Sequence, residues 1–568
     1  MSRTGGPLSY VCGAGGPPLV HRTVGRVLDD AADAWGERPA LIAPQQQLRL
    51  SYRELKQRAD ELAASFVALG LRPGDRIGIW SPNNAEWVIT QFAAAKAGLI
   101  LVTINPAYRL RELEFALNKV GCRALVTAER FKSSDYLAML LELAPELEHS
   151  APGQLRAARV PQLEVVIRLG QEASPCPGFW LFDELESRVS DAGRVALEAL
   201  AARLQPDDAI NIQFTSGTTG SPKGATLTHS NIVNNAIQVA ARQRFTCEDR
   251  LCIPVPLYHC FGMVMGVLGC VTHGAAMVLP SAGFEAERVL ETVSEERCTA
   301  LYGVPTMFVA ELNHPKFASF DLTSLRTGVM AGAPCPIELM NRVSRDMRLK
   351  EITICYGMTE TSPVSFQSKT DDPIEKRVTS VGRVQPYVEA KIVDPEGRTV
   401  ARGEMGELLT RGYHVMLGYW DDDSQTGQVI DAARWMHSGD LATLDAEGYC
   451  NIVGRVKDMI IRGGENVYPR EIEEFLYTHP KVQVAQVFGI PDARYGEVVC
   501  AWIRLQEGAR CEVEEIIEYC RSQIAHYKIP THIEFVDEFP MTVTGKAQKY
   551  LMRQQMTQRL GLKEASTA

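Results

Sequence analysis

The chain has 568 residues, of which 45% are apolar and 23% are charged. This length exceeds what a single hydrophobic core usually supports, so two or more domains are expected, and the composition argues against extensive disorder. The formal net charge of -10 argues against a protein that binds nucleic acid, because such binding needs a basic surface.

The fourteen cysteines are scattered and form no CxxC pair, so the sequence predicts buried, reduced thiols rather than a zinc site. The Gly- and Pro-rich N-terminus lacks the apolar stretch of a secretory signal. The most hydrophobic stretch, residues 261–279, contains His273 and four glycines. It predicts a buried helix-turn-strand rather than a transmembrane segment. Together these features predict a cytoplasmic protein.

Predicted strands and helices alternate along the first two thirds of the chain. Residues 53–69 carry an apolar stripe at helical spacing, and the run DRIGIW that follows at 75–80 predicts a strand. Further helices are expected at 84–97, 111–119 and 231–242. Further strands are expected at 99–104, 124–127, 209–214, 298–304, 326–331 and 351–355, and a long loop at 148–177. Such alternation is typical of parallel sheets covered by helices on both faces.

The pattern changes after about residue 381. Turn sequences at 394–397 (DPEG) and 445–448 (DAEG) separate short strands and predict a small β-rich part. Beyond the charged segment 455–458, the helices expected at 471–477 and 513–523 alternate with the strands expected at 484–490, 498–505 and 532–535. The predicted fold class is therefore α/β. A large N-terminal domain of several subdomains (1–456), with parallel-sheet layers and a small β-barrel-like part, precedes a small α+β C-terminal domain (457–568).

The segment TSGTTGSPKG at 215–224 carries the strongest chemical signal. Three glycines let the backbone approach an anion, five hydroxyl side chains offer hydrogen bonds, and Lys223 adds a positive charge. The segment follows a predicted strand and is expected to precede a helix, where backbone N–H groups can point at a phosphate. A flexible Gly/Ser linker is the alternative, but the lysine favours phosphate binding. The spacing does not fit the G-x-x-x-x-G-K-[ST] loop of kinases and GTPases.

This segment resembles the phosphate loop of the adenylate-forming superfamily, which includes acyl-CoA synthetases, luciferase-like enzymes and peptide-synthetase adenylation domains. Further motifs follow in the order typical of that family: YGMTE (356–360), W-x-x-S-G-D (435–440), GRVKD (454–458), RGGEN (462–466) and TGK (544–546). Ser438 stands where the family usually has threonine, and Thr544 where serine is commoner. The stretches NIQFTSGTTGSPKGATLTH and GRVKDMIIRGGENVYP resemble the medium-chain acyl-CoA synthetase branch.

The resemblance implies a site for ATP and Mg²⁺. The triphosphate would be bound by Thr215, Ser216, Gly217, Thr218, Thr219, Gly220 and Lys223. Thr359 would contact the α-phosphate, and Glu360 would bind Mg²⁺, which prefers oxygen ligands. The adenine pocket would be formed by Gly332, Ala333, Pro334, Tyr356 and Gly357. Asp440, assisted by Arg455, would accept hydrogen bonds from the ribose. Taken singly, Tyr356 could be a core residue, Asp440 a turn residue and Glu360 a carboxylate at a helix start.

The resemblance also implies a catalytic lysine and a mobile C-terminal domain. Lys546 would lie between the substrate carboxylate and the α-phosphate as a point charge, with a solvated surface lysine as the alternative. His259 would lie near the carboxylate. The domain would rotate about Lys457, so that a loop with Gly463, Gly464 and Glu465 reaches coenzyme A.

The acyl pocket would be lined by Phe261, Met263, Met265, Gly266, Val304 and Val329. These residues are apolar, and Gly262 and Gly266 suggest room for a chain, so a medium-chain fatty acid is predicted. The expected activity is ATP-dependent ligation of that acid to coenzyme A through an acyl-AMP, with release of AMP and pyrophosphate.

Three alternatives remain open at this point. The enzyme could deliver its acyl-AMP to a carrier protein, it could be a luciferase-like oxygenase, or it could bind nucleotide without catalysis. The mitochondrial matrix is the alternative compartment, because relatives suggested by the resemblance are found there. The sequence leaves open whether the protein forms a homo-oligomer.

Overall fold

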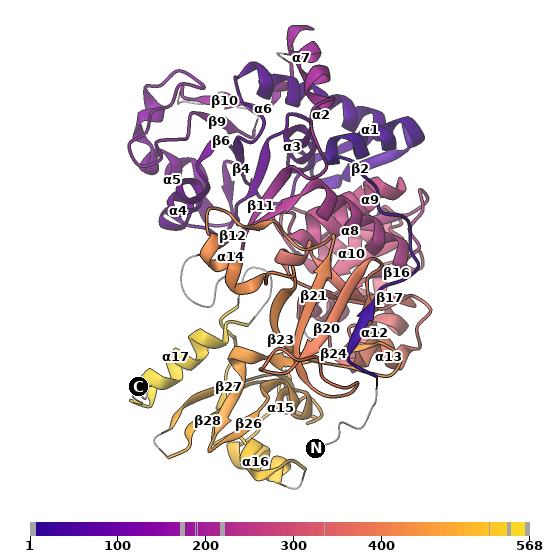
Figure 1. The fold of residues 1–568 in the computed structure, drawn as a ribbon, viewed down its shortest axis with the longest axis vertical. Coiled ribbons are helices and arrows are strands. Elements are labelled where there is room, and N and C mark those ends of the chain that lie inside the picture. Colours follow the sequence, from indigo (N-terminus) through magenta and orange to yellow (C-terminus); the bar gives the residue numbers. More distant parts are fainter. Residues whose placement is uncertain are drawn as a thin grey trace.

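The computed structural model describes residues 7–170, 177–187, 189, 191–215, 222–333, 335–492, 494–521, 523–541 and 547–562. The described residues form two large sheets, a small antiparallel sheet and a C-terminal sheet, besides a two-stranded hairpin of β7 (Arg130–Phe131) and β8 (Ser134–Asp135). Helices cover the large sheets (Figure 1). The predicted α/β class, with a large N-terminal part and a small C-terminal part, is confirmed.

The first large sheet has eight strands, parallel from β10 to β11 and antiparallel at β12 and β22. In spatial order they are β10 (Phe179–Leu181), β9 (Val165–Arg168), β6 (Cys122–Thr127), β4 (Arg76–Trp80), β5 (Ile100–Thr103), β11 (Ala209–Thr215), β12 (Lys223–Thr228) and β22 (Gly418–Tyr419). The connecting helices are α3 (Ala85–Lys96), α4 (Leu110–Val120), α5 (Tyr136–Leu143), α6 (Phe182–Ser187) and α7 (Asp191–Ala201). The expectation of a loop over 148–177 was partly wrong, because β9 is a four-residue strand, too short for a periodic signal.

The second large sheet has nine strands and a parallel centre from β17 to β2. In spatial order they are β19 (Arg383–Val384), β18 (Val364–Gln367), β17 (Glu351–Gly357), β16 (Thr327–Met330), β15 (Ala300–Gly303), β13 (Arg250–Cys252), β14 (Ala276–Val278), β2 (Pro39–Ala43) and β3 (Leu48–Ser51). Its helices are α1 (Val24–Trp35), α2 (Tyr52–Ala68), α8 (His229–Arg242), α10 (Ala286–Glu295), α11 (Pro305–Leu312), α12 (Ile337–Asp346) and α13 (Ile374–Thr379).

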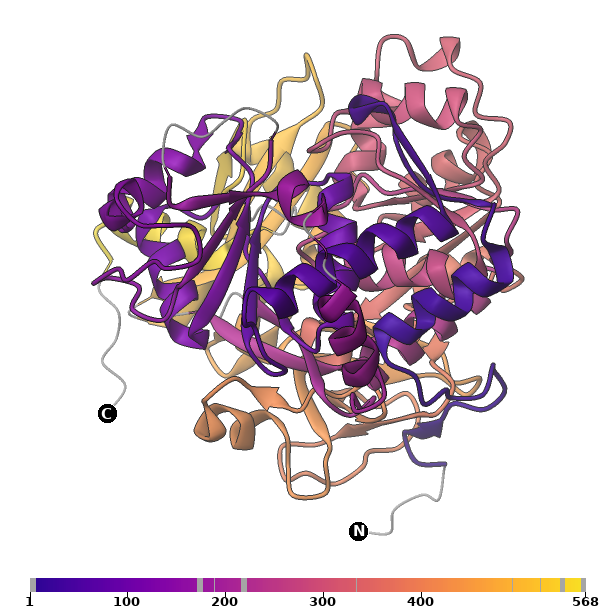
Figure 2. The same cartoon turned by 90° about the horizontal axis from the view of Figure 1, so that it is seen from above.

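One core extends through both large sheets. The predicted helix at 53–69 forms α2, whose first turn is closed by a capping box between Ser51 and Glu54, an arrangement that satisfies otherwise unpaired backbone groups. Helix α3 is buried almost all round and contacts β4, β5 and β2, so it lies between the sheets. From above, the purple strands of the first sheet lie beside the pink elements of the second (Figure 2).

The hydrophobic stretch 261–279 folds as predicted. It forms a π-helix, η3 (Phe261–Leu268), then α9 (Gly269–His273) and strand β14. No helix within the described residues is long and apolar enough to cross a membrane. Most of the described cysteines are buried, and all of them are free thiols.

The small sheet orders its strands β1 (Tyr10–Cys12), β20 (Val388–Val393), β21 (Gly406–Gly412), β23 (Met436–Leu444) and β24 (Cys450–Arg455), all antiparallel. Helix α14 (Asp423–Val429) precedes β23. The C-terminal sheet contains β25 (Ile460–Arg462), β26 (Glu465–Val467), β27 (Val482–Asp492), β28 (Gly496–Leu505) and β29 (His532–Phe535). Its helices are α15 (Pro469–Leu476), α16 (Val513–Arg521) and α17 (Lys549–Arg559).

The chain passes from the small sheet to the C-terminal sheet between β24, which ends at Arg455, and β25, which begins at Ile460. The predicted boundary at 456–457 lies between these two strands. The C-terminal sheet lies at one end of the molecule (Figure 1) and has hydrophobic clusters of its own. Helix α17 was not predicted, because Met552 and Met556 are its only buried residues and two apolar positions give little periodicity.

Glu311 is a carboxyl group buried in α11 without a hydrogen-bond partner in the described part of the chain. Burial raises its pKa well above the ordinary value, so the folded protein holds more protons than the unfolded chain once the pH exceeds about 4.5. The cost of this group therefore grows as the pH rises. We expect Glu311→Met to stabilise the protein by about 1–3 kcal/mol at pH 8 and by less at pH 5, as measured by thermal unfolding. An equal gain from the exposed control Glu295→Met would contradict this.

Candidate active site

The carboxyl ends of three neighbouring parallel strands meet at one edge of the second sheet. β15 leads to Val304, β16 leads to Gly332 and Ala333, and β17 ends with Tyr356 and Gly357. Gly332 has a φ of +89°, and a Cβ atom there would lie 3.2 Å from Val304, so glycine is favoured on both counts. This edge is where ligands bind in open α/β sheets.

Tyr356 reaches from this edge to the small sheet. Its hydroxyl donates a hydrogen bond to Asp440 Oδ2 at 2.5 Å, and Arg455 Nε donates to Asp440 Oδ1 at 3.1 Å. Asp440 is only 5% exposed, and its position on β23 is directly opposite Arg455 on β24. Burial and the Asp440 charge raise the pKa of Tyr356 well above its ordinary value. The phenol therefore stays a donor at neutral pH.

The predicted phosphate segment joins β11 to β12. Thr215 and Lys223 are paired at the ends of these antiparallel strands, and Ser216, Gly217, Thr218, Thr219 and Gly220 lie outside the described residues. The expectation that the segment directly precedes a helix was wrong, because β12 intervenes before α8. Backbone N–H groups at the N-terminus of α8 therefore lie one strand away from the loop.

Glu360 provides a buried carboxylate beside this hairpin. It lies in a 3₁₀ turn, Thr359–Thr361, that follows β17, and it is 9% exposed. Its Oε1 accepts a hydrogen bond from Tyr419 at 2.8 Å, and it makes no ion pair with any described residue. Because a buried carboxylate without a cationic partner is costly, Glu360 fits the binding of a hard divalent cation such as Mg²⁺.

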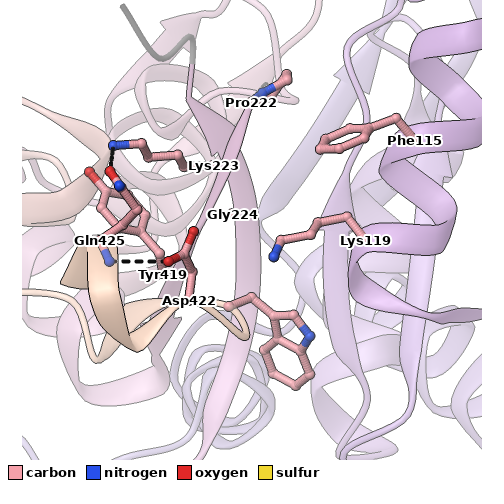
Figure 3. A pocket seen from close by; sticks show the side chains of 9 residues that line it. Phe115, Lys119, Pro222, Lys223, Gly224, Tyr419, Asp422 and Gln425 are labelled. Carbon is pink, nitrogen blue, oxygen red and sulfur yellow. Dashed lines mark hydrogen bonds between the residues drawn. The ribbon is translucent and has the colours of Figure 1, made fainter. Parts of the chain in front are cut away.

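Lys223 lies on the other side of Tyr419. Its ammonium group is 5.1 Å from the centre of the Tyr419 ring and donates a hydrogen bond to Gln425. Figure 3 shows these side chains at a pocket of about 340 Å³, with Phe115 and Lys119 projecting toward it from α4. The pocket lies next to the end of the phosphate segment, since Pro222 and Lys223 line it.

The predicted acyl-site residues lie on and beside η3. His259 precedes this helix and accepts a hydrogen bond from Phe261 N at 3.1 Å, while Cys260 N donates to Gln213 on β11 at 3.0 Å. The start of η3 is thus tied to the strand that leads into the phosphate segment. π-Helices occur frequently at functional sites.

Two glycines do not have the role that the sequence suggested. A Cβ atom on Gly262 would lie 2.3 Å from the Pro256 carbonyl oxygen, and one on Gly266 would lie 3.1 Å from Ile253. They allow η3 to pack closely on the segment after β13, so the argument that they leave room for an acyl chain was wrong. The other residues predicted to line the acyl site are buried and apolar: Phe261, Met263, Met265, Val304 and Val329.

Several predicted residues are not brought to this site. Lys457 is exposed. Gly463 and Gly464 form an exposed turn between β25 and β26, and Glu465, the first residue of β26, is exposed as well. Gly463 N donates to the Tyr495 carbonyl at 2.8 Å, within the C-terminal domain. Pro334 and Lys546 lie outside the described residues.

The sequence did not point to Tyr419 or Gln425. Neither residue belongs to a motif that was identified, and each reaches the site through pairing that is remote in the chain. Tyr419 is placed by the pairing of β22 with β12, and Gln425 by the first turn of α14, where Asp422 accepts from Gln425 N at 3.1 Å. The local feature that could have drawn attention to Tyr419 was the pair of aromatic residues after a glycine in Gly418-Tyr-Trp420.

The chain is similar to known enzymes over almost its whole length. Residues 28–420 match the AMP-binding enzymes, and residues 471–546 match the C-terminal domain of AMP-binding enzymes. The chain is 47% identical to the medium-chain acyl-CoA ligase ACSF2, mitochondrial, of Danio rerio, over 98% of this chain and 91% of the relative. It is 46% identical to the putative acyl-CoA synthetase YngI of Bacillus subtilis, over 96% and 99%.

Solved structures share the overall fold. The anthranilate CoA ligase AuaEII in complex with anthranoyl-AMP has a TM-score of 0.84 and 28% identity, with 96% of this chain and 99% of that chain covered. ATP-bound MatB from Rhodopseudomonas palustris has a TM-score of 0.80 and 28% identity, with 94% and 98% covered.

Proposed function

Since the chain belongs to the AMP-binding enzyme family, we propose that it ligates a medium-chain fatty acid to coenzyme A. ATP first converts the acid to an acyl-AMP with release of pyrophosphate, and the thiol of coenzyme A then displaces AMP. A free carboxylate does not acylate a thiol, because its carbonyl carbon is electron-rich and its leaving group is poor. The mixed anhydride with phosphate supplies a good leaving group.

One observation carries this proposal. The buried carboxylate of Glu360, which has no ion pair among the described residues, adjoins the hairpin that carries Lys223. Strand β17, which precedes the turn that carries Glu360, ends with Tyr356, and the Tyr356 hydroxyl donates to Asp440, which also accepts from Arg455. A buried carboxylate, a lysine and a second buried carboxylate thus lie near one sheet edge, and this supports roles for them in binding the cation, the phosphates and the ribose of magnesium–ATP.

The protein's own residues would act as follows. Thr215–Gly220 and Lys223 hold the triphosphate, Thr359 contacts the α-phosphate, and Glu360 binds the cation. When bound, Mg²⁺ would offset the negative charge of the phosphates. Gly332, Ala333, Pro334, Tyr356 and Gly357 enclose adenine, and Asp440 with Arg455 orients the ribose. The main barrier to adenylation is the cost of bringing two anions, the carboxylate and the triphosphate, together in line. These contacts lower that barrier.

The second step needs another arrangement of the C-terminal domain. The exposed turn at Gly463, Gly464 and Glu465 lies in a sheet separate from the N-terminal site. We propose a domain boundary at 456–457, with rotation about Lys457 that brings this turn to coenzyme A. Lys546 would act only in the first step.

The medium-chain preference is supported by the named relatives and by the apolar wall around η3. His259 would lie where the carboxylate enters. A reducing compartment, the cytoplasm or the mitochondrial matrix, is supported by the free thiols of the described cysteines and by relatives whose names include the word mitochondrial.

Pyrophosphate release measured with ATP and Mg²⁺ across straight-chain acids from acetate to palmitate tests the proposal. We expect turnover to peak at middle chain lengths and to require coenzyme A, with acyl-CoA as the product. Release of a single equivalent that stalls despite coenzyme A would instead indicate a carrier protein as acceptor. Absence of release with every acid would contradict the proposed activity.

A further inference from the structure

Tyr419 is held between the two elements that would bind the triphosphate and its cation. Its strand, β22, pairs with β12 through Ala225 and Tyr419. Just before it, Met416 N donates to the Glu360 carbonyl at 2.9 Å, and Leu417 N donates to the Thr226 carbonyl at 3.0 Å. These backbone hydrogen bonds, to the turn that carries Glu360 and to β12, therefore fix the position from which the Tyr419 side chain extends.

The phenol of Tyr419 contacts only one oxygen of the Glu360 carboxylate. The hydrogen bond from the hydroxyl to Oε1 is 2.8 Å long, and both side chains are buried, at 8% and 9% exposure. The other described residues form no hydrogen bond or ion pair with Oε2, so on this side the second oxygen can face a cation. A tyrosine hydroxyl is protonated at neutral pH, and an ionised carboxylate can only accept, so the hydroxyl is the donor in this hydrogen bond.

The face of the same ring contacts the base of the phosphate segment. Lys223 lies 5.1 Å from the ring centre, a favourable placement for a cation, and Gln425 accepts a hydrogen bond from its ammonium group (Figure 3). Lys223 is paired with Thr215 at the mouth of the hairpin. One side chain thus contacts the carboxylate by its edge and the lysine by its face.

From these contacts we infer that Tyr419 is a positioning residue that aims the Glu360 carboxylate at the cation of the magnesium–ATP complex. The inference rests on the proposed function, which makes Glu360 the ligand. A carboxylate that binds a metal is commonly fixed by a hydrogen bond to its other oxygen, and loss of such a bond typically weakens metal binding by about 10- to 100-fold.

Tyr419→Phe tests the inference, because it removes the hydroxyl and keeps the ring on which Lys223 lies. Binding of Mn²⁺ to the full-length protein with a non-hydrolysable ATP analogue is measured from the electron paramagnetic resonance signal of the free ion. We expect the dissociation constant for Mn²⁺ to rise by about 10- to 100-fold. Turnover at saturating metal should return to within about threefold of the wild-type rate, because the hydroxyl acts on affinity and not on the reacting atoms.

Tyr449→Phe is a matched control. The Tyr449 hydroxyl also donates to a buried carboxylate, Asp372 Oδ1, at 2.8 Å, but at a site away from the phosphate segment. The affinity of the Tyr449→Phe variant for Mn²⁺ should stay within about twofold of wild type. Unchanged Mn²⁺ affinity in Tyr419→Phe, or in Glu360→Gln, would overturn the inference.

This measurement is independent of the proposed reaction, because it uses neither fatty acid nor coenzyme A. Weaker Mn²⁺ binding in Tyr419→Phe, in a protein that forms no acyl-CoA, would support the role of Tyr419 and refute the ligase. Acyl-CoA formation, together with unchanged Mn²⁺ affinity in Tyr419→Phe, would support the ligase and refute the role of Tyr419. Thermal unfolding of Tyr419→Phe within a few degrees of wild type excludes misfolding as the cause.

Discussion

Replacement of Lys546 by alanine is expected to slow acyl-AMP formation by about 100- to 1000-fold, because removal of a group that stabilises transition-state charge typically costs about 3–4 kcal/mol. Negative charge grows on the phosphate oxygens as the carboxylate attacks, and a flexible ammonium group can follow it. Exchange of labelled pyrophosphate into ATP measures this step directly. The affinity for ATP should change much less, since the effect lies in the transition state.

The second half-reaction provides the internal control. With synthetic acyl-AMP supplied, Lys546→Ala should form acyl-CoA at a rate within a few fold of wild type, because Lys546 is assigned to the first step alone. The surface variant Lys316→Ala, whose side chain is 66% exposed and pairs with Glu287, should leave both rates unchanged. Equal losses in both half-reactions would refute the assignment of Lys546 to adenylation.

The alternating part of the fold could be predicted from sequence because its elements carry local patterns. α2 buries an apolar stripe at helical spacing, and β4 is a short, almost wholly apolar run of the kind that buried parallel strands form. β9 and α17 lacked such a signal, since one is four residues long and the other buries two methionines. Their positions depend on pairing with β6 and on packing against β27, which are tertiary effects.

The candidate site divides in the same way. Tyr356 and Asp440 could be identified because each belongs to a short motif, although they are 84 positions apart and meet only through the fold. Tyr419 could not be identified, because its importance comes from pairing of β22 with a strand that lies almost 200 positions earlier. Gly262 and Gly266 were misread, since a missing side chain in sequence does not reveal which neighbour occupies the space. Here those neighbours are the backbone of Pro256 and the side chain of Ile253.

Asp440 offers the second large effect. We expect Asp440→Ala to lower kcat/KM for ATP by about 100-fold or more. A hydrogen bond to a charged group contributes about 1.5–3 kcal/mol, and two ribose hydroxyls would lose the carboxylate to which they donate. Asp440 lies between Tyr356 and Arg455, so its position is fixed before ATP binds. The loss should appear mainly as a raised KM for ATP, measured by pyrophosphate release at saturating fatty acid.

Asp440→Asn separates the charge of this residue from its place in the fold. The amide keeps an oxygen for the Tyr356 hydroxyl but loses the ion pair with Arg455, whose side chain is 53% exposed and can be solvated. We therefore expect a loss of about 10-fold, intermediate between wild type and Asp440→Ala, with little change in thermal stability. Equal losses in the two variants would mean that the negative charge, and not hydrogen-bond acceptance, controls ATP binding. An unchanged KM for ATP in both would exclude Asp440 from the ribose site and leave its bonds to Tyr356 and Arg455 a structural link between the second large sheet and the small sheet.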